Sequence, residues 1–96
     1  MKPSEALPQH REAIRQLVEQ AGMKNPRVFG SVVRGEDEDG SDLDLLVDPA
    51  PRTTLLDLAG LQIELEAKTG IKVDLLTPKF LPEKFRRRVL EEAQPV

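Results

Sequence analysis

The chain of 96 residues has a net charge of −3, no cysteine, and only three aromatic residues, all of them phenylalanine. Its length suits one small domain with a limited core, and the missing cysteines exclude a disulfide framework and a thiolate metal site. The acidic balance and the scarcity of aromatic rings argue against direct binding of nucleic acid. No signal peptide or membrane-spanning segment is evident in the sequence, which predicts a cytoplasmic protein without membrane contact.

The first predicted element is an amphipathic helix that begins near Pro8 and ends near Ala21. Apolar residues recur there at helical spacing, Pro8 suits a first helical turn, and Gly22 suits the position just past a helix end. Residues 1–7 are expected to form a frayed lead-in. His10 is the only histidine, and we interpret it as a surface residue because no second ligand is evident.

A short strand is predicted at Arg27–Phe29, and it leads into Gly30-Ser31 and a short helix that ends at Arg34. Glycine lets a ligand approach the backbone, and the N–H groups at a helix start have no partner within the helix. This bend therefore fits a phosphate, with the Ser31 hydroxyl and the Arg34 guanidinium as further donors. A plain turn is the alternative interpretation of Gly-Ser before a helix.

An acidic loop follows, Glu36-Asp37-Glu38-Asp39. We interpret it as a solvated, mobile tip, and the alternative is that it contacts a basic partner. Ser41 then either caps the turn into the next strand or contributes to the ligand site.

The next predicted strand, Leu43–Val47, is notable for Asp42 and Asp44, which are two residues apart. Alternate residues of a strand face the same way, so the two carboxylates share one face and the apolar residues face the core. Two such charges about 5 Å apart repel by roughly 3 kcal/mol at an effective dielectric near 20. Mg²⁺ bound with a nucleotide's phosphates would offset this repulsion. A solvated edge strand would show the same Asp-x-Asp pattern.

A helix is predicted after the proline-rich link at residues 49–51, capped by Thr53 or Thr54 and closed by Gly70. Its apolar face is interpreted as core packing, and its main residues are Leu55, Leu58, Leu61 and Leu65.

The third predicted strand, Ile71–Leu76, places Asp74 between apolar neighbours, as Asp44 is placed in the strand before it. A strand–helix–strand unit is compatible with a parallel or mixed sheet covered by helices. If the two strands are adjacent, three carboxylates converge. Two can then bind metal while the third orients or deprotonates a hydroxyl, which is the logic of two-metal nucleotidyl transfer.

The last predicted element is a helix with Pro82 in its first turn. Its basic run, Arg86-Arg87-Arg88, is interpreted as a solvated face. The alternative is that these arginines, together with Lys84, bind an acidic partner or the phosphates of a nucleotide.

The combined pattern is Gly30-Ser31, ten residues, Asp42-x-Asp44, and Asp74 on a later strand. It resembles the polymerase-β-type nucleotidyltransferase superfamily, and most closely its minimal members, the MNT-type proteins. The resemblance implies an α/β polymerase-β-like nucleotidyltransferase fold, in which helices pack on a short mixed sheet. We expect a single minimal domain over residues 1–96.

MNT-type proteins are commonly encoded beside a HEPN-domain protein as toxin–antitoxin pairs. The resemblance implies that AMP is transferred from ATP to a hydroxyl of the HEPN toxin, a tyrosine, with two Mg²⁺ ions and release of pyrophosphate. It implies catalytic and metal-binding roles for Asp42, Asp44 and Asp74. It implies nucleotide binding by Gly30, Ser31, Arg34 and Ser41.

Two other functions remain open at this stage. One is a non-catalytic, nucleotide-binding antitoxin that neutralises its partner by complex formation, which the presence of all three carboxylates disfavours. The other is transfer to a small molecule or to an RNA 3′ end. The chain lacks an obvious substrate domain for the first acceptor, and its acidic charge and few aromatics disfavour the second.

Overall fold

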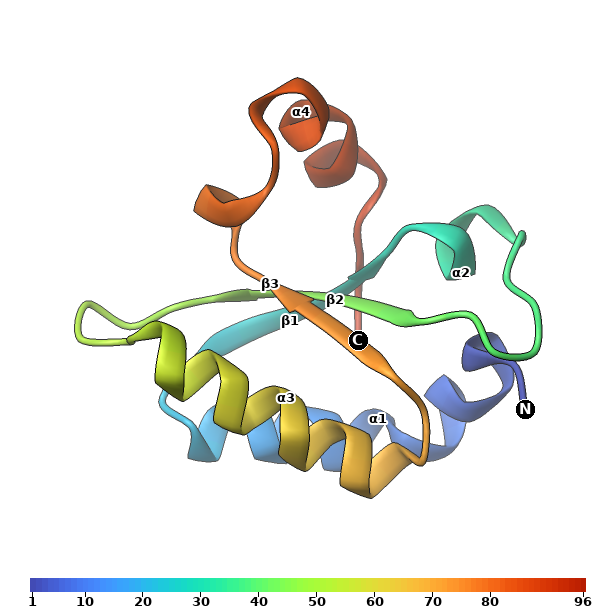
Figure 1. The fold of residues 1–96 in the computed structure, drawn as a ribbon, viewed down its shortest axis with the longest axis horizontal. Helices are drawn as coiled ribbons and strands as arrows, with labels where there is room; N and C mark the ends of the chain where they lie inside the picture. Colours follow the sequence, from blue (N-terminus) through green and yellow to red (C-terminus); the bar gives the residue numbers. More distant parts are fainter.

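The fold is a four-stranded mixed sheet with helices on both faces, as the computed structural model of residues 1–96 describes it (Figure 1). The strands follow the order β3-β2-β1-β4 across the sheet, where β2 pairs antiparallel with β1 and parallel with β3. Their bounds are Lys24–Phe29 for β1, Leu43–Asp48 for β2, Val73–Leu76 for β3 and Gln94–Pro95 for β4. The predicted α/β class with a short mixed sheet is confirmed.

The two faces of the sheet are covered unequally (Figure 1). Two long helices, α1 (Pro3–Gln20) and α3 (Leu55–Thr69), lie together against one face. A 3₁₀ turn at Pro78–Phe80 then leads to α4 (Glu83–Glu92), which lies over the opposite face. The four-residue helix α2 (Ser31–Arg34) follows β1 directly.

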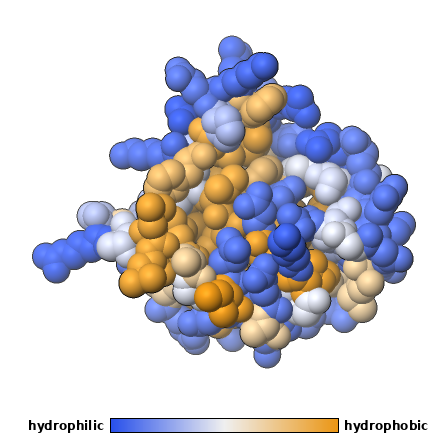
Figure 2. Space-filling model, in the orientation of Figure 1, coloured by the Kyte–Doolittle hydropathy of each residue, from blue (hydrophilic) through white to orange (hydrophobic).

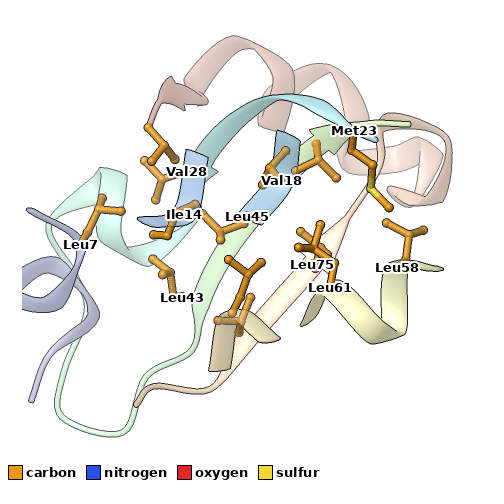
Figure 3. Packing of buried hydrophobic residues seen from close by; sticks show 14 residues of the cluster. Leu7, Ile14, Val18, Met23, Val28, Leu43, Leu45, Leu58, Leu61 and Leu75 are labelled. Carbon is orange, nitrogen blue, oxygen red and sulfur yellow. The ribbon is translucent and has the colours of Figure 1, made fainter. Parts of the chain in front are cut away.

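The main core lies between the sheet and the pair α1 and α3 (Figure 3). Leu45 of β2 is completely buried there, together with Ile14 of α1 and Leu61 of α3. Because side chains alternate along a strand, the residues next to Leu45 face the other side of the sheet. There Phe29, Leu46 and Leu81 form a smaller cluster of buried residues.

Helix α3 begins and ends with the residues that the sequence predicts. The Thr54 hydroxyl accepts the Asp57 N–H at 3.1 Å, and the Asp57 carboxylate accepts the Thr54 N–H at 2.9 Å, which makes a reciprocal capping box. Gly70 ends the helix at φ 72°, a left-handed conformation that glycine adopts readily. These local signals fix the length of the connection between β2 and β3.

The expectation of a frayed segment at residues 1–7 is wrong. Helix α1 already begins at Pro3, and Ala6 and Leu7 are buried, with Leu7 in the main core. Pro8 lies inside the helix, where it cannot donate a backbone hydrogen bond. The burial of the apolar residues before Pro8 offsets this loss near the helix start.

The interpretation of the acidic loop as a wholly solvated tip is also wrong. Asp37 is buried, and its carboxylate accepts the Ser4 N–H at 2.8 Å. This hydrogen bond at the start of α1 lowers the pKa of Asp37 below its usual value. One acid of the loop therefore ties it to the N-terminus of α1, where a negative charge is favourable.

The short edge strand β4 was not predicted. It pairs antiparallel with β1, and the Arg15 guanidinium of α1 donates to the Val96 carbonyl at 2.9 Å. Three other strand boundaries differ from prediction: β1 begins at Lys24 rather than Arg27, β2 ends at Asp48 rather than Val47, and β3 begins at Val73 rather than Ile71. None of the helices has the length and apolar character that crossing a bilayer requires.

Candidate active site

Two of the predicted catalytic carboxylates lie side by side on adjacent strands. The parallel register of β2 and β3 pairs Asp44 directly with Asp74. Both lie on the face away from α1 and α3, since their strand neighbours Leu45 and Leu75 belong to the main core. Asp42 lies just before the first residue of β2.

The charge on Asp44 is disfavoured by its surroundings. Burial is the largest cause, and the charges of Asp74 and Asp42 add to it, so that the pKa of Asp44 rises to about 6. The Arg34 guanidinium acts in the opposite direction without cancelling the rise. Asp44 is thus the point at which three carboxylates and one guanidinium influence one another, as the sequence predicts for Asp42, Asp44 and Asp74.

Gly30 ends β1 in a conformation that only glycine adopts readily, with φ 76° and ψ −145°. Its neighbour Phe29 pairs with Asp44 across the antiparallel ladder. A Cβ atom added at Gly30 would collide with the Asp44 carboxylate. The bend therefore combines two requirements for glycine, namely the backbone angle and the close approach of the carboxylate.

Arg34 closes α2 and lies close to this bend. Its guanidinium donates to Glu92 at 3.0 Å and to Glu36 at 3.1 Å. The Glu92 carboxylate oxygen that accepts from Arg34 also accepts the Gly30 N–H, at 3.2 Å. Arg34 and Gly30 therefore point donors at one common position.

The two predicted serines lie in different settings. Ser31 begins α2 directly after Gly30 and is half-buried. The Ser41 hydroxyl accepts the Glu38 N–H at 2.9 Å, so it braces the turn that leads toward β2. This contact corresponds to the first of the two roles predicted for Ser41, which is to cap the turn before β2.

A cavity of about 270 Å³ lies between α4 and the sheet. Its polar part is formed by Gly30, Arg34, Asp44 and Glu92, and its wall also includes Arg88. Its apolar part comprises Phe29, Leu76, Leu81, Phe85 and Val89. In the orientation of Figure 1, hydrophobic surface is visible between α4 and the sheet and is surrounded by hydrophilic residues (Figure 2). The cavity is therefore lined by groups that can donate hydrogen bonds to an anion, by a carboxylate and by an apolar wall.

The donor chemistry of this face suits a divalent cation such as Mg²⁺. Carboxylate oxygens are its preferred protein ligands, and the mutual repulsion at Asp44, Asp74 and Asp42 is what a cation would relieve. No group of three or more acidic, histidine or cysteine side chains is arranged to hold a metal by itself. Proteins commonly bind Mg²⁺ through one or two carboxylates together with water and substrate phosphates. The residues fit a cation that arrives with a polyphosphate.

Sequence reasoning missed Glu92. It lies 62 residues from Gly30 along the chain, and its contact depends on α4 folding back over the sheet. No local pattern marks it, because it sits among other charged residues at the end of an amphipathic helix.

The bend at Gly30, the carboxylates on β2 and β3 and the mixed sheet together define a nucleotidyltransferase domain. The family model described as the nucleotidyltransferase domain matches residues 7–96. The chain belongs to this family, and the predicted resemblance to minimal nucleotidyltransferases is confirmed.

Particular relatives refine this assignment. The chain is 40% identical over 78 residues to the protein adenylyltransferase MntA of Thermococcus cleftensis, which covers 81% of this chain and 79% of the relative. A solved structure that is provisionally described as a minimal nucleotidyltransferase is 44% identical and superposes with a TM-score of 0.85, over 97% of this chain and 95% of the other.

A more distant likeness is to a Shewanella oneidensis complex in which a tri-AMPylated HEPN toxin is bound to an MNT antitoxin. The identity is 17% and the TM-score 0.70, over 92% of this chain and 69% of the matched chain. At this identity the likeness shows the fold alone.

Proposed function

We propose that this protein is an antitoxin nucleotidyltransferase that transfers AMP from ATP to a tyrosine hydroxyl of a HEPN-domain toxin and releases pyrophosphate. The observation that carries the proposal is the pairing of Asp44 with Asp74 beside the Gly30 bend, with Asp42 close enough to raise the pKa of Asp44. The adenylyltransferase relative supports the reaction, and the AMPylated HEPN toxin of the Shewanella oneidensis complex is the reason for proposing a HEPN toxin as the acceptor protein. Because ATP is the donor, we expect the protein to act in the cytoplasm.

The nucleotide's phosphates bind at the bend after β1. Gly30 supplies a backbone N–H and carries no side chain of its own to block a ligand, Ser31 supplies a hydroxyl, and Arg34 a positive charge. The Ser41 hydroxyl keeps the loop before β2 in place through its bond with Glu38. Gly30, Ser31 and Arg34 hold the β- and γ-phosphates, so that the α-phosphate lies beside the carboxylates.

Asp42 and Asp44 would hold two Mg²⁺ ions, which supply neutralisation of the charge that develops on the phosphates. Asp74 is solvent-exposed and lies next to Asp44, so an incoming hydroxyl can reach it. It accepts the hydroxyl proton while the oxygen bonds to the α-phosphorus in line. The bond from the α-phosphorus to the bridging oxygen breaks, and pyrophosphate leaves.

The acceptor comes from a partner protein. Exposed apolar side chains that lie together support an interaction with another protein, because such a surface often marks a binding site. Leu55 of α3 and Phe80 of the 3₁₀ turn are exposed and line the same surface hollow.

The test is to incubate the protein with ATP, Mg²⁺ and the product of the neighbouring gene as the candidate HEPN partner, and to weigh that partner by mass spectrometry. Mass gains of whole AMP units are expected. Asp42→Asn should abolish them, whereas Asp48→Asn should not. Asp42 lies just before β2, whereas Asp48 is the last residue of that strand, where it pairs with Arg27 at 3.0 Å. A stable complex with no added mass would reject transfer and indicate neutralisation by binding alone.

A further inference from the structure

Glu92 places a carboxylate at the position where the site directs its anion donors. It is the last residue of α4, and its side chain is only 19% exposed. One carboxylate oxygen accepts both the Gly30 N–H at 3.2 Å and the Arg34 guanidinium at 3.0 Å. The donors that would hold a phosphate are thus already occupied by an anion of the same chain.

A carboxylate and a phosphate compete for such donors because both present anionic oxygens to N–H groups. Hydrogen bonds to charged acceptors are stronger than those between neutral groups, so the occupant contributes to the energetics of the site. Glu36 also pairs with Arg34, at 3.1 Å, but its side chain is 61% exposed, and only Glu92 accepts from Gly30 as well. Only Glu92 accepts from both the Gly30 N–H and the Arg34 guanidinium, as a phosphate oxygen would.

The backbone around Glu92 is anchored. Directly after it, the chain enters β4, where Gln94 pairs with Val28 of β1. The Ala93 N–H donates to the Val89 carbonyl, which keeps the end of α4 closed. Release of the carboxylate from Gly30 and Arg34 therefore requires only rotation of the Glu92 side chain, and α4 can stay where it is.

We propose that Glu92 is a built-in competitor of the nucleotide, whose carboxylate fills the phosphate position of the resting site and must leave before a polyphosphate binds. This inference rests on the proposed function, because it takes the Gly30 and Arg34 donors as the phosphate site. The apparent affinity for a ligand falls in proportion to the fraction of molecules in which the site is free. Glu92 thereby sets the nucleotide concentration at which the enzyme becomes active.

The test is calorimetric titration of the whole protein with tripolyphosphate and with ATP, each with Mg²⁺ present. Glu92→Gln keeps the shape of the side chain and removes its charge. We expect it to bind both ligands about three- to tenfold more tightly than the wild-type protein. Glu92→Asp keeps the charge but shortens the reach by one methylene, and it should also bind more tightly.

The matched control is Glu91→Gln, which changes the net charge equally. Glu91 is exposed and pairs only with Arg87 on its own helix, so its substitution should leave both affinities unchanged. Equal or weaker binding by Glu92→Gln would overturn the proposal, as would absence of binding in both the wild type and the variant. Thermal melting checks that each variant is folded.

The two proposals can fail separately. If no AMP reaches the HEPN protein but Glu92→Gln still binds polyphosphate more tightly, the transfer proposal fails and the competitor role stands. If transfer proceeds and Glu92→Gln binds no more tightly than wild type, the competitor role fails and transfer stands.

Discussion

The two faces of the sheet are built from the same strands but serve different ends. Toward α1 and α3, Leu45 is completely buried in a cluster of 14 apolar residues. Toward α4, its neighbour Asp44 is half-buried, and burial and like charges raise its pKa to about 6. The cluster of buried apolar residues on this second face has only three members. Within one strand, Leu45 thus contributes to stability, and its neighbour Asp44 belongs to the candidate site.

The packed face holds the second face of the sheet in an unfavourable electrostatic state. A carboxylate pair such as Asp44 and Asp74 costs free energy when no cation is present, and the packed face offsets that cost. Substitutions on the two faces should therefore have different effects. Those on the face toward α1 and α3 should lower stability, whereas those on the face toward α4 should lower activity and leave stability unchanged or higher.

The largest effect on stability is expected from Leu45→Ala. Truncating a completely buried leucine costs about 2–5 kcal/mol of unfolding free energy, because it removes buried surface and leaves a cavity. In a domain of this size each kcal/mol lowers the melting temperature by about 4–8 °C. Urea unfolding measures the loss, and Leu56→Ala, on an exposed position of α3, should change stability by no more than about 0.5 kcal/mol. Similar losses from both variants would contradict the assignment of the core.

Two glycines with similar φ but different ψ flank α2: Gly30 lies at ψ −145° and Gly35 at ψ 26°. Gly30→Ala introduces a Cβ that collides with Asp44, whereas Gly35→Ala, at φ 71°, has open space around the Cβ. Gly35→Ala should lose about 1 kcal/mol because its backbone is left-handed, and Gly30→Ala should lose about 1–3 kcal/mol because its φ and ψ lie in a region almost exclusive to glycine. Gly30→Ala should in addition weaken ATP binding at least about tenfold, since it displaces the bend and the carboxylate together. Equal ATP affinities of the two variants would show that the bend does not bind the nucleotide.

The smallest effect on stability is expected from Asp44→Asn in metal-free protein, and its sign depends on pH. A raised pKa means that the folded protein favours the protonated carboxyl, so the ionised form destabilises the fold as pH rises through about 6. Asp44→Asn removes this penalty and should stabilise the protein by about 1 kcal/mol at pH 7.5, a value reduced for the partial exposure of the group.

At about pH 3, below the ordinary aspartate pKa of 3.8, the difference should almost vanish, because the wild-type carboxyl is then mostly protonated in the folded and the unfolded protein alike. Thermal melting at the two pH values measures both numbers. A variant that is less stable than wild type at pH 7.5 would show that Asp44 contributes to folding rather than opposing it.

Local chemistry made much of this fold predictable. Thr54 and Gly70 mark the ends of α3 through caps that need only neighbouring residues. The alternation around Asp44 and Asp74 predicted one shared face, because side-chain direction in a strand follows from backbone geometry alone. The family pattern then joined these strands to the Gly30 bend.

Contacts between distant residues account for what sequence reasoning missed. Helix α1 begins before Pro8 because Leu7 reaches the core, and Asp37 is buried because Ser4 donates to it. Glu92 contacts Gly30 only because α4 crosses the open face of the sheet. No spacing of apolar residues in the sequence predicts these contacts, because each depends on how separate elements pack.

The decisive measurement for the proposed transfer is the rate of AMP transfer by Asp74→Asn. Asp74 is exposed, so its substitution should leave the melting temperature almost unchanged while it removes the charge that we propose accepts the hydroxyl proton. The account predicts a fall in the transfer rate of about 10²–10⁴-fold, relative to wild type and to Asp48→Asn. Transfer at the wild-type rate by a folded Asp74→Asn protein would contradict it.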